Sequence, residues 1–180
     1  MQRIREEYSS LSKFFHWTIA LIVIPMVLGS FFLGDLPSGV RGTAIALHKS
    51  FGLTVLLLML LRIIWIFFAG RPVLPDSVPR WQRILAHAVQ YALYLTVLAM
   101  PLVGWMMSQA AGHTPRFFGL FALPFPGISE NKALSDLLFD IHQKIAFVII
   151  GLLCLHIAGA IKHYFIDKDV VVKRMLPRWR

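Results

Sequence analysis

The chain has 180 residues, of which 57% are hydrophobic, a mean hydropathy of +0.68 and a formal net charge of +9. Soluble domains of this size are rarely so apolar, whereas small polytopic membrane proteins commonly are. Its single cysteine, Cys154, excludes a framework of disulfide bonds.

Four apolar runs, each long enough to cross a hydrocarbon layer of about 30 Å as a helix, divide the chain. The runs are 16–33, 43–68, 85–107 and 139–165. They predict an all-α, polytopic membrane four-helix bundle with up-down-up-down topology, formed by one membrane domain over residues 1–180. The first run lacks a small-residue cleavage site, so we expect it to be a span that contacts lipid and not a signal peptide.

The basic residues are divided unequally between the two sides of the predicted membrane. Thirteen lie on the side of both termini: Arg3, Arg5, Lys13, Arg62, Arg71, Arg80, Arg83, Lys162, Lys168, Lys173, Arg174, Arg178 and Arg180. Five lie on the other side: Arg41, Lys49, Arg116, Lys132 and Lys144. The positive-inside rule then predicts a bacterial inner-membrane protein with cytoplasmic N- and C-termini. Because orientation accounts for the charge, we expect no nucleic-acid partner.

The first two runs each carry a histidine near the N-terminal end. His16 lies near the cytoplasmic boundary and His48 near the periplasmic boundary. Lys49 adjoins His48, and Gly52 follows one turn later. Arg62, fourteen residues after His48, shares its face at the opposite membrane level. Interfacial histidines and a snorkelling arginine are the simple explanations, and ligands with their supporting residues are the functional alternative.

The third run begins with His87 and contains Pro101, which we expect to kink it. The following segment, about 108–138, is aromatic but broken by proline and glycine in PRFFGLFALPFPG, so it is predicted to cap the bundle at the outer interface. His87 could serve as a ligand in place of His16 or line a binding pocket.

The fourth run places His142 and His156 fourteen residues apart, on one face and about 21 Å apart along a helix. His163 follows His156 by seven residues, beside Lys162 at the cytoplasmic boundary. His163 could hydrogen-bond and protonate a quinone there, or anchor the helix at the interface. Lys144 lies close to His142, on the outer side.

Membrane depth pairs the histidines of different runs. His48 is level with His142, and His16 is level with His156, so each pair could hold one iron by two axial imidazoles. Without a CxxCH motif, two such haems would be non-covalent b-type haems. In that arrangement Lys49 and Lys144 could bind the outer propionates and Arg62 the inner ones, while Gly52 would leave room for a flat macrocycle.

Several motifs support a family resemblance along nearly the entire chain. The chain resembles bacterial cytochrome b561 in the motifs FFHW, AIALHKSFGL, LLMLLRIIW, LAHAVQYALY, AMPLVGWMMS, FFGLFALP, HQKIAFVIIGLLCLHIAGAIKHYF and RMLPR. The resemblance implies a di-haem b cytochrome of the inner membrane that exchanges electrons with the quinone pool, and at least one family member passes electrons from superoxide to ubiquinone. It implies His16, His48, His142 and His156 as axial ligands and His163 at the quinone. The family commonly reads AHxxH in the third helix, where this chain has Gln90 at the second histidine.

The leading hypothesis is therefore an oxidoreductase that transfers single electrons from a periplasmic donor, with superoxide as the candidate, to ubiquinone, with His163 and Lys162 as catalytic residues. Lys49, Arg116, Lys132 and Lys144 could steer an anionic donor. The alternative is a haem-bearing anchor subunit that carries electrons for a partner dehydrogenase or hydrogenase and accepts them from a redox protein. A small metal or proton transporter would use the same histidines but would be colourless.

Overall fold

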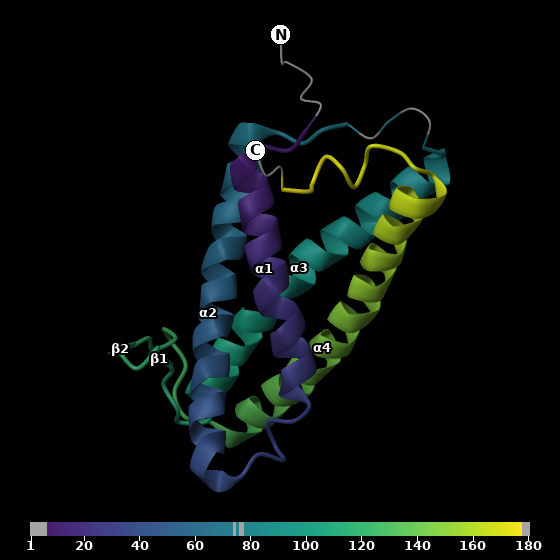
Figure 1. Ribbon diagram of the computed structural model, residues 1–180. Helices are drawn as coiled ribbons and strands as arrows, with labels where there is room; N and C mark the ends of the chain where they lie inside the picture. The colour runs from purple at the N-terminus through teal and green to yellow at the C-terminus, as the bar shows by residue number, and fades with distance from the viewer. Residues whose placement is uncertain (1–6, 74, 76–77, 178–180) are drawn as a thin grey trace.

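The computed structural model describes residues 7–73, 75 and 78–177, and this part of the chain contains a bundle of four long helices (Figure 1). The helices are α1 Ser10–Ser30, α2 Ser38–Ala69, α3 Arg80–Ala110 and α4 Lys132–Ile161, which continues as the π-helix η1 Lys162–Ile166. A short antiparallel hairpin of β1 Arg116–Phe117 and β2 Phe121–Ala122 lies between α3 and α4.

All four helices are long and apolar enough to cross a membrane, which confirms the prediction of a four-helix membrane bundle. The predicted runs lie inside these helices with two departures. Residues 31–33 lie in the turn after α1, and the last run ends within η1. Each helix starts five to seven residues before the predicted run because its first turns are polar and extend beyond the apolar stretch.

Local sequence signals set the ends of the helices. The Ser9 hydroxyl accepts a hydrogen bond from the Ser12 amide (3.2 Å), and the Asn131 side chain accepts one from the Leu134 amide (3.0 Å). Both are N-caps that satisfy otherwise unpaired first-turn amides. Gly70, with φ +71°, ends α2 in a left-handed conformation that favours glycine.

The hairpin is the element that the sequence did not predict. Phe118 and Gly119 both have positive φ, and the Leu120 amide donates to the Phe117 carbonyl (2.9 Å), which closes a tight turn. The buried Ser50 of α2 fixes the hairpin, because its hydroxyl accepts from the Phe118 amide (3.0 Å). The predicted outer segment is thus ordered against α2, as Figure 1 shows.

The apolar core joins residues of all four helices. A row of α1 residues, Phe15, Ile19, Val23 and Val27, packs in one cluster with Val55, Met59, Val97 and Ile149. Consecutive helices pack against one another along their backbones, but α4 packs closely against neither α1 nor α2. Figure 1 shows α4 inclined away from that pair.

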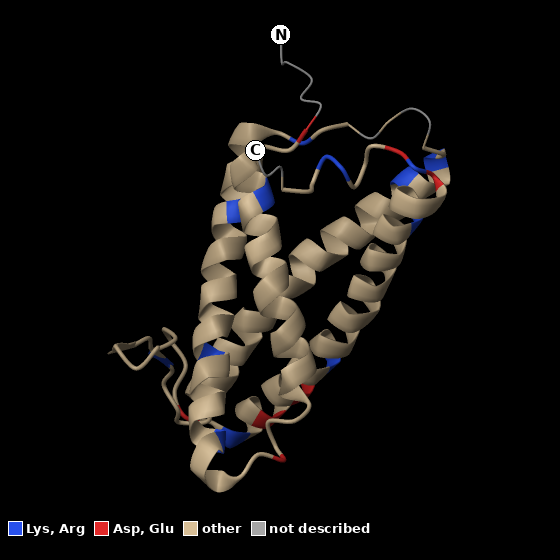
Figure 2. Cartoon of the chain, viewed as in Figure 1, with Lys and Arg blue, Asp and Glu red and all other residues tan. Residues whose placement is uncertain are grey.

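The C-terminal segment folds back over the end of the bundle where α1 begins. The Trp17 indole donates to the Met175 carbonyl (2.9 Å), and Arg174 donates to the Val73 carbonyl (2.7 Å). The first and last described residues therefore lie at the same end. Figure 2 shows basic residues gathered at the two ends of the described bundle and few along its middle.

Candidate functional site

The histidine pair predicted to lie on the outer side, here called the outer pair, joins two helices that do not pack closely. His48 of α2 and His142 of α4 face each other with ring centres 6.3 Å apart and ring planes at 70°. Both side chains are only partly exposed. The structure thus brings together the two residues that membrane depth predicted to be partners.

The inner pair repeats this arrangement near the other end of the bundle. His16 of α1 and His156 of α4 have ring centres 6.1 Å apart and planes at 66°. Here too the pair bridges helices without close backbone packing. His87, the alternative to His16, is exposed on α3 with its ring near that of Tyr91 (6.4 Å between centres), so the geometry favours His16 as the partner of His156.

Both separations fit two axial ligands of one iron. An iron bound to two imidazole nitrogens at about 2.0 Å, with each ring centre about 1.1 Å behind its nitrogen, separates the ring centres by about 6.2 Å. Direct edge-to-face packing of rings occurs at similar distances. Iron ligation also needs room for a flat macrocycle beside the rings, and two neighbouring glycines leave such room. A methyl group added at Gly159, one turn after His156, would meet nothing within 4 Å, and one at Gly52 would meet only Met26, at 4.0 Å.

The His142 ring lies against the backbone of α3. A Cβ added at Gly104 would lie 3.0 Å from Cε1 and 3.3 Å from Nδ1 of this imidazole. Among the described residues, His142 Nδ1 is the one buried side-chain nitrogen or oxygen atom without a hydrogen-bond partner. The backbone of Met100, also on α3, nonetheless interacts with this imidazole, and a backbone contact of this kind orients a ring that could serve as a ligand. Gly104 was not predicted as a site residue.

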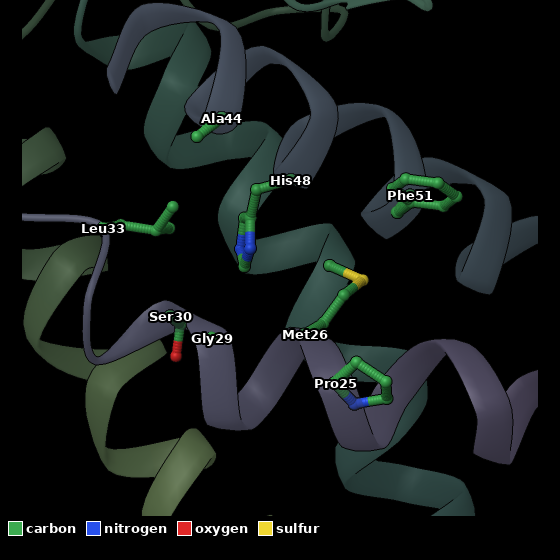
Figure 3. Close-up of a pocket in the computed structure, with 8 residues that line it drawn as sticks. All are labelled: Pro25, Met26, Gly29, Ser30, Leu33, Ala44, His48 and Phe51. Carbon is green, nitrogen blue, oxygen red and sulfur yellow. The ribbon is translucent and has the colours of Figure 1, made fainter. Parts of the chain in front are cut away.

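An open groove of about 220 Å³ adjoins His48 between α1 and α2. Figure 3 shows the His48 ring pointing from α2 toward α1, with Leu33 on one side and Met26 on the other. The lining is mainly apolar, which suits the edge of a flat aromatic group better than a hydrated ion.

Arg62 is directed into the bundle, so the snorkelling explanation is wrong. Its side chain is buried (8% exposed); Nε donates to the Tyr94 hydroxyl (2.9 Å) and Nη1 donates to the Ser12 carbonyl (3.0 Å). The guanidinium thereby connects α2 with α1 and α3, and its charge interacts electrostatically with both inner histidines. A guanidinium has five donors, so others remain for an anionic group.

The outer lysines differ in their surroundings. Lys49 is half-buried and Lys144 exposed, and in the described part of the chain neither forms a hydrogen bond or ion pair. Lys132 is paired with Asp136 (2.9 Å), and Arg116 donates to the Gly119 carbonyl (3.3 Å). Of these four cations, only Lys132 is neutralised by a carboxylate in the described part of the chain, and Lys49 and Lys144 are the two nearest to His48 and His142 in sequence.

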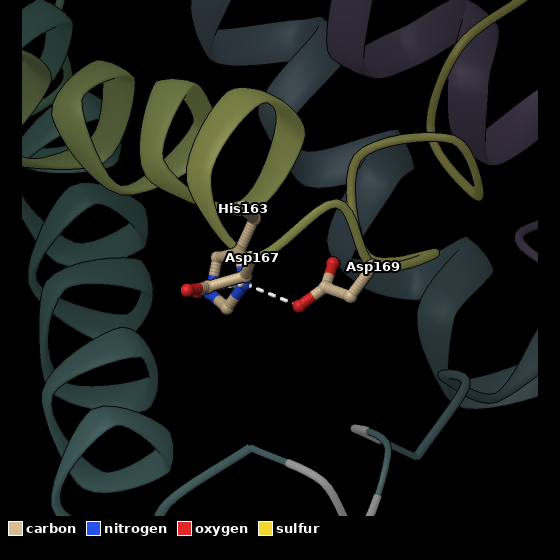
Figure 4. Close-up of side chains that lie close together, drawn as sticks. All are labelled: His163, Asp167 and Asp169. Carbon is tan, nitrogen blue, oxygen red and sulfur yellow. Dashed lines mark hydrogen bonds and ion pairs between the residues drawn. The ribbon is translucent and has the colours of Figure 1, made fainter.

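A second cluster lies at the inner end of α4 (Figure 4). His163 Nδ1 is 2.6 Å from Asp169 Oδ2 and 3.4 Å from Asp167 Oδ2, and Lys162 Nζ is 2.5 Å from the Asp167 carboxylate. Both predicted catalytic residues, His163 and Lys162, therefore belong to one charged network. The two aspartates were not predicted, although the sequence IDKD directly after this helix carries them.

Comparisons with known proteins agree with these observations. A family model described as prokaryotic cytochrome b561 matches residues 7–178. Cytochrome b561 homolog 2 of Escherichia coli (strain K12) is 32% identical over 173 residues, which cover 95% of this chain and 92% of the relative. Cytochrome b561 homolog 1 of the same organism is 29% identical over 174 residues (95% and 97%). A probable superoxide oxidase CybB of Yersinia pestis is 28% identical over 179 residues (98% and 99%).

Proposed function

Because the chain belongs to the prokaryotic cytochrome b561 family of membrane electron-transfer proteins, we propose that it binds two b-type haems and transfers single electrons across the bacterial inner membrane to ubiquinone. His48 and His142 would hold the outer haem, and His16 and His156 the inner one. The observation that carries the proposal is the pair of ring-centre separations, 6.3 and 6.1 Å, at two levels of one bundle.

The side chains of this protein would determine where the two haems bind. When bound, the haems supply reversible one-electron chemistry. The imidazoles would hold each iron, Arg62 would offer a buried positive charge to the inner site, and Lys49 and Lys144 would offer cations to the outer site. With cytoplasmic termini, as the basic residues suggest, His48 and His142 lie on the periplasmic side.

Superoxide is the donor that we propose. Two superoxide anions would each lose one electron to give two molecules of oxygen, and one ubiquinone would take up the two electrons and two protons to give ubiquinol. The name of the Yersinia pestis relative supports this donor. The outer side has nearly balanced charges, with five basic and four acidic residues, so attraction of the anion depends on the local placement of Lys49 and Lys144.

The purified protein should be reduced by superoxide in a stopped-flow spectrophotometer and reoxidised by a ubiquinone analogue. Replacing both Lys49 and Lys144 with glutamine should lower the rate of haem reduction about tenfold at low ionic strength, because steering contributes factors of about 10 to 1000. Lys132→Gln, which removes a cation already paired with Asp136, should change the rate little. A protein without reducible b-type absorbance despite ample haem supply, or one not reduced faster than superoxide dismutates, would contradict the proposal.

The Gly104→Ala variant tests the outer site. The added methyl group would lie 3.0 Å from the His142 ring, so the imidazole must move. We expect lower occupancy or a shifted reduction potential of the outer haem, with the inner haem unchanged, in a pyridine haemochrome assay combined with redox titration. Gly42→Ala is the matched control, because a methyl group there meets nothing within 4 Å. Equal haem content and potentials in the two variants would refute the assigned contact.

One observation favours the alternative of an anchor subunit for a partner dehydrogenase or hydrogenase. The hairpin exposes Phe118, Leu120 and Phe121 and is held in place by Ser50. An ordered apolar projection is typical of surfaces that meet protein or lipid. Purification in mild detergent distinguishes the two functions: a stable, large redox partner supports the anchor, and a lone chain that oxidises superoxide supports the oxidoreductase.

A further inference from the structure

The charged network around His163 is compact and largely shielded from water. His163 and Asp169 expose only 12% and 14% of their side chains. Asp169 is 2.6 Å from Nδ1, while Asp167 lies between this ring and the Lys162 ammonium group. A π-helical turn produces the arrangement, since the Asp167 amide donates to the Lys162 carbonyl five residues earlier (3.0 Å). Such turns are frequent at functional sites.

The carboxylates contact Nδ1 of the His163 imidazole and leave Nε2 available for proton exchange. With Nδ1–H donated to a carboxylate, the tautomer is fixed and Nε2 is the atom that can exchange a proton. In the described part of the chain, no residue forms a hydrogen bond with His163 Nε2. The carboxylate of Asp169 also stabilises the ring when both nitrogens are protonated.

The same carboxylates line a polar pocket of about 310 Å³. Its other lining residues are Val78, Pro79 and Gln82, from the start of α3 and the segment before it. Gln82 is neutral and lies 3.4 Å from Lys162 Nζ, and Arg83 is directed to the Val78 carbonyl (2.7 Å).

The two carboxylates that contact His163, those of Asp167 and Asp169, come from its own segment. The residues after it, Tyr164, Phe165 and Ile166, are exposed and apolar, as expected for a surface that faces lipid. His163 thus lies where a lipid-facing surface and a polar pocket adjoin the same short segment.

We propose that Asp169 is a positioning residue that makes His163 the proton donor to the quinone, and that water in the polar pocket resupplies the protons. This inference rests on the proposed function. Quinone reduction consumes two electrons, supplied one at a time through the inner haem, and two protons. Each proton leaves Nε2 of the protonated ring for a quinone oxygen, Asp169 retains the Nδ1–H bond, and the ring regains its proton from water.

A divalent metal ion is the competing occupant of this cluster. One donor atom from each of His163, Asp167 and Asp169 lies within 4.8 Å of the others. However, the Lys162 ammonium already neutralises Asp167 at 2.5 Å, which favours a proton-transfer network. Chelation separates the two possibilities: the wild type should retain its quinone-reduction rate after treatment with EDTA, and a loss that zinc restores would overturn the proposal.

The Asp169→Asn variant tests the role of this carboxylate. We expect the alkaline limb of the pH profile for haem oxidation by quinone to move to lower pH, because the neutral amide no longer balances a positive charge on the ring. The rate at alkaline pH should fall about tenfold while the rate at low pH stays near that of the wild type. Asp169→Glu should restore much of the alkaline rate. Asp136→Asn, on the outer side, is the control for removal of an aspartate.

Three outcomes would overturn the inference: an unchanged profile in Asp169→Asn, a loss that is equal at every pH, or the same shift in Asp136→Asn. An equal loss at every pH would indicate a merely structural contact. Haem spectra report the integrity of each variant, since both histidine pairs lie outside this network. If the wild type forms quinol and only the Asp169 prediction fails, the proposed function stands. If the wild type reduces no quinone, the proposed function itself fails.

Discussion

Replacing His156 with alanine should remove the inner haem and retain the outer one, and replacing His142 should do the reverse. Each histidine faces a single partner, His16 or His48, so its loss would leave the proposed haem at that level with one protein ligand. We expect haem content to fall from about two to about one per chain, because a b-type haem depends on its axial ligands for retention. Electron transfer from superoxide to quinone should stop in both variants.

Two measurements distinguish these variants from general misfolding. Redox titration should show a different single potential in each variant, since the retained haem lies at a different level. His113→Ala, in the exposed outer segment, should keep both haems and both potentials. Retention of two haems by His142→Ala and His156→Ala would refute the assignment of the ligands.

The Arg62→Gln variant should lower the reduction potential of the inner haem and destabilise the bundle. A positive charge favours the reduced iron, and the guanidinium interacts electrostatically with both inner histidines, so its removal should lower the inner potential by tens of millivolts. The substitution also removes the bonds to the Tyr94 hydroxyl and the Ser12 carbonyl, and leaving a buried polar group without its hydrogen-bond partner typically costs about 1–3 kcal/mol. Redox titration and thermal unfolding in detergent measure the two effects.

Arg62→Lys separates charge from hydrogen bonding. Lysine keeps the positive charge but lacks the planar group that reaches both Tyr94 and Ser12. This variant should therefore lose stability much as Arg62→Gln does, while the inner potential stays close to that of the wild type. An unchanged inner potential in Arg62→Gln would show that the arginine is purely structural.

The bundle and the histidine pairs were predictable because depth follows directly from position along an apolar run. Each span of known direction converts residue number into membrane level at about 1.5 Å per residue. His48 and His142 were therefore matched before their geometry was known, and so were His16 and His156. The ring separations add what depth cannot supply, namely that the members of each pair point toward each other.

Other features depend on contacts between distant segments, which a linear pattern does not encode. The flexible side chain of Arg62 can reach either the interface or the bundle interior from the same backbone position, and only Tyr94 and Ser12 decide the outcome. Gly104 matters because a ring from α4 crosses it. The β1–β2 hairpin has two residues per strand, too few for a strand pattern, and depends on Ser50 for anchorage.

The loose backbone packing of α4 against α1 and α2 has a consequence for the life of the protein in the cell. If bound tetrapyrrole completes the contacts between these helices, a newly inserted chain remains incompletely folded until it binds the tetrapyrrole. The free energy of this binding is then part of the free energy of folding. Membrane proteases would remove unloaded chains first, so the steady-state amount of this protein should follow the biosynthetic output of tetrapyrrole more closely than the level of its messenger RNA.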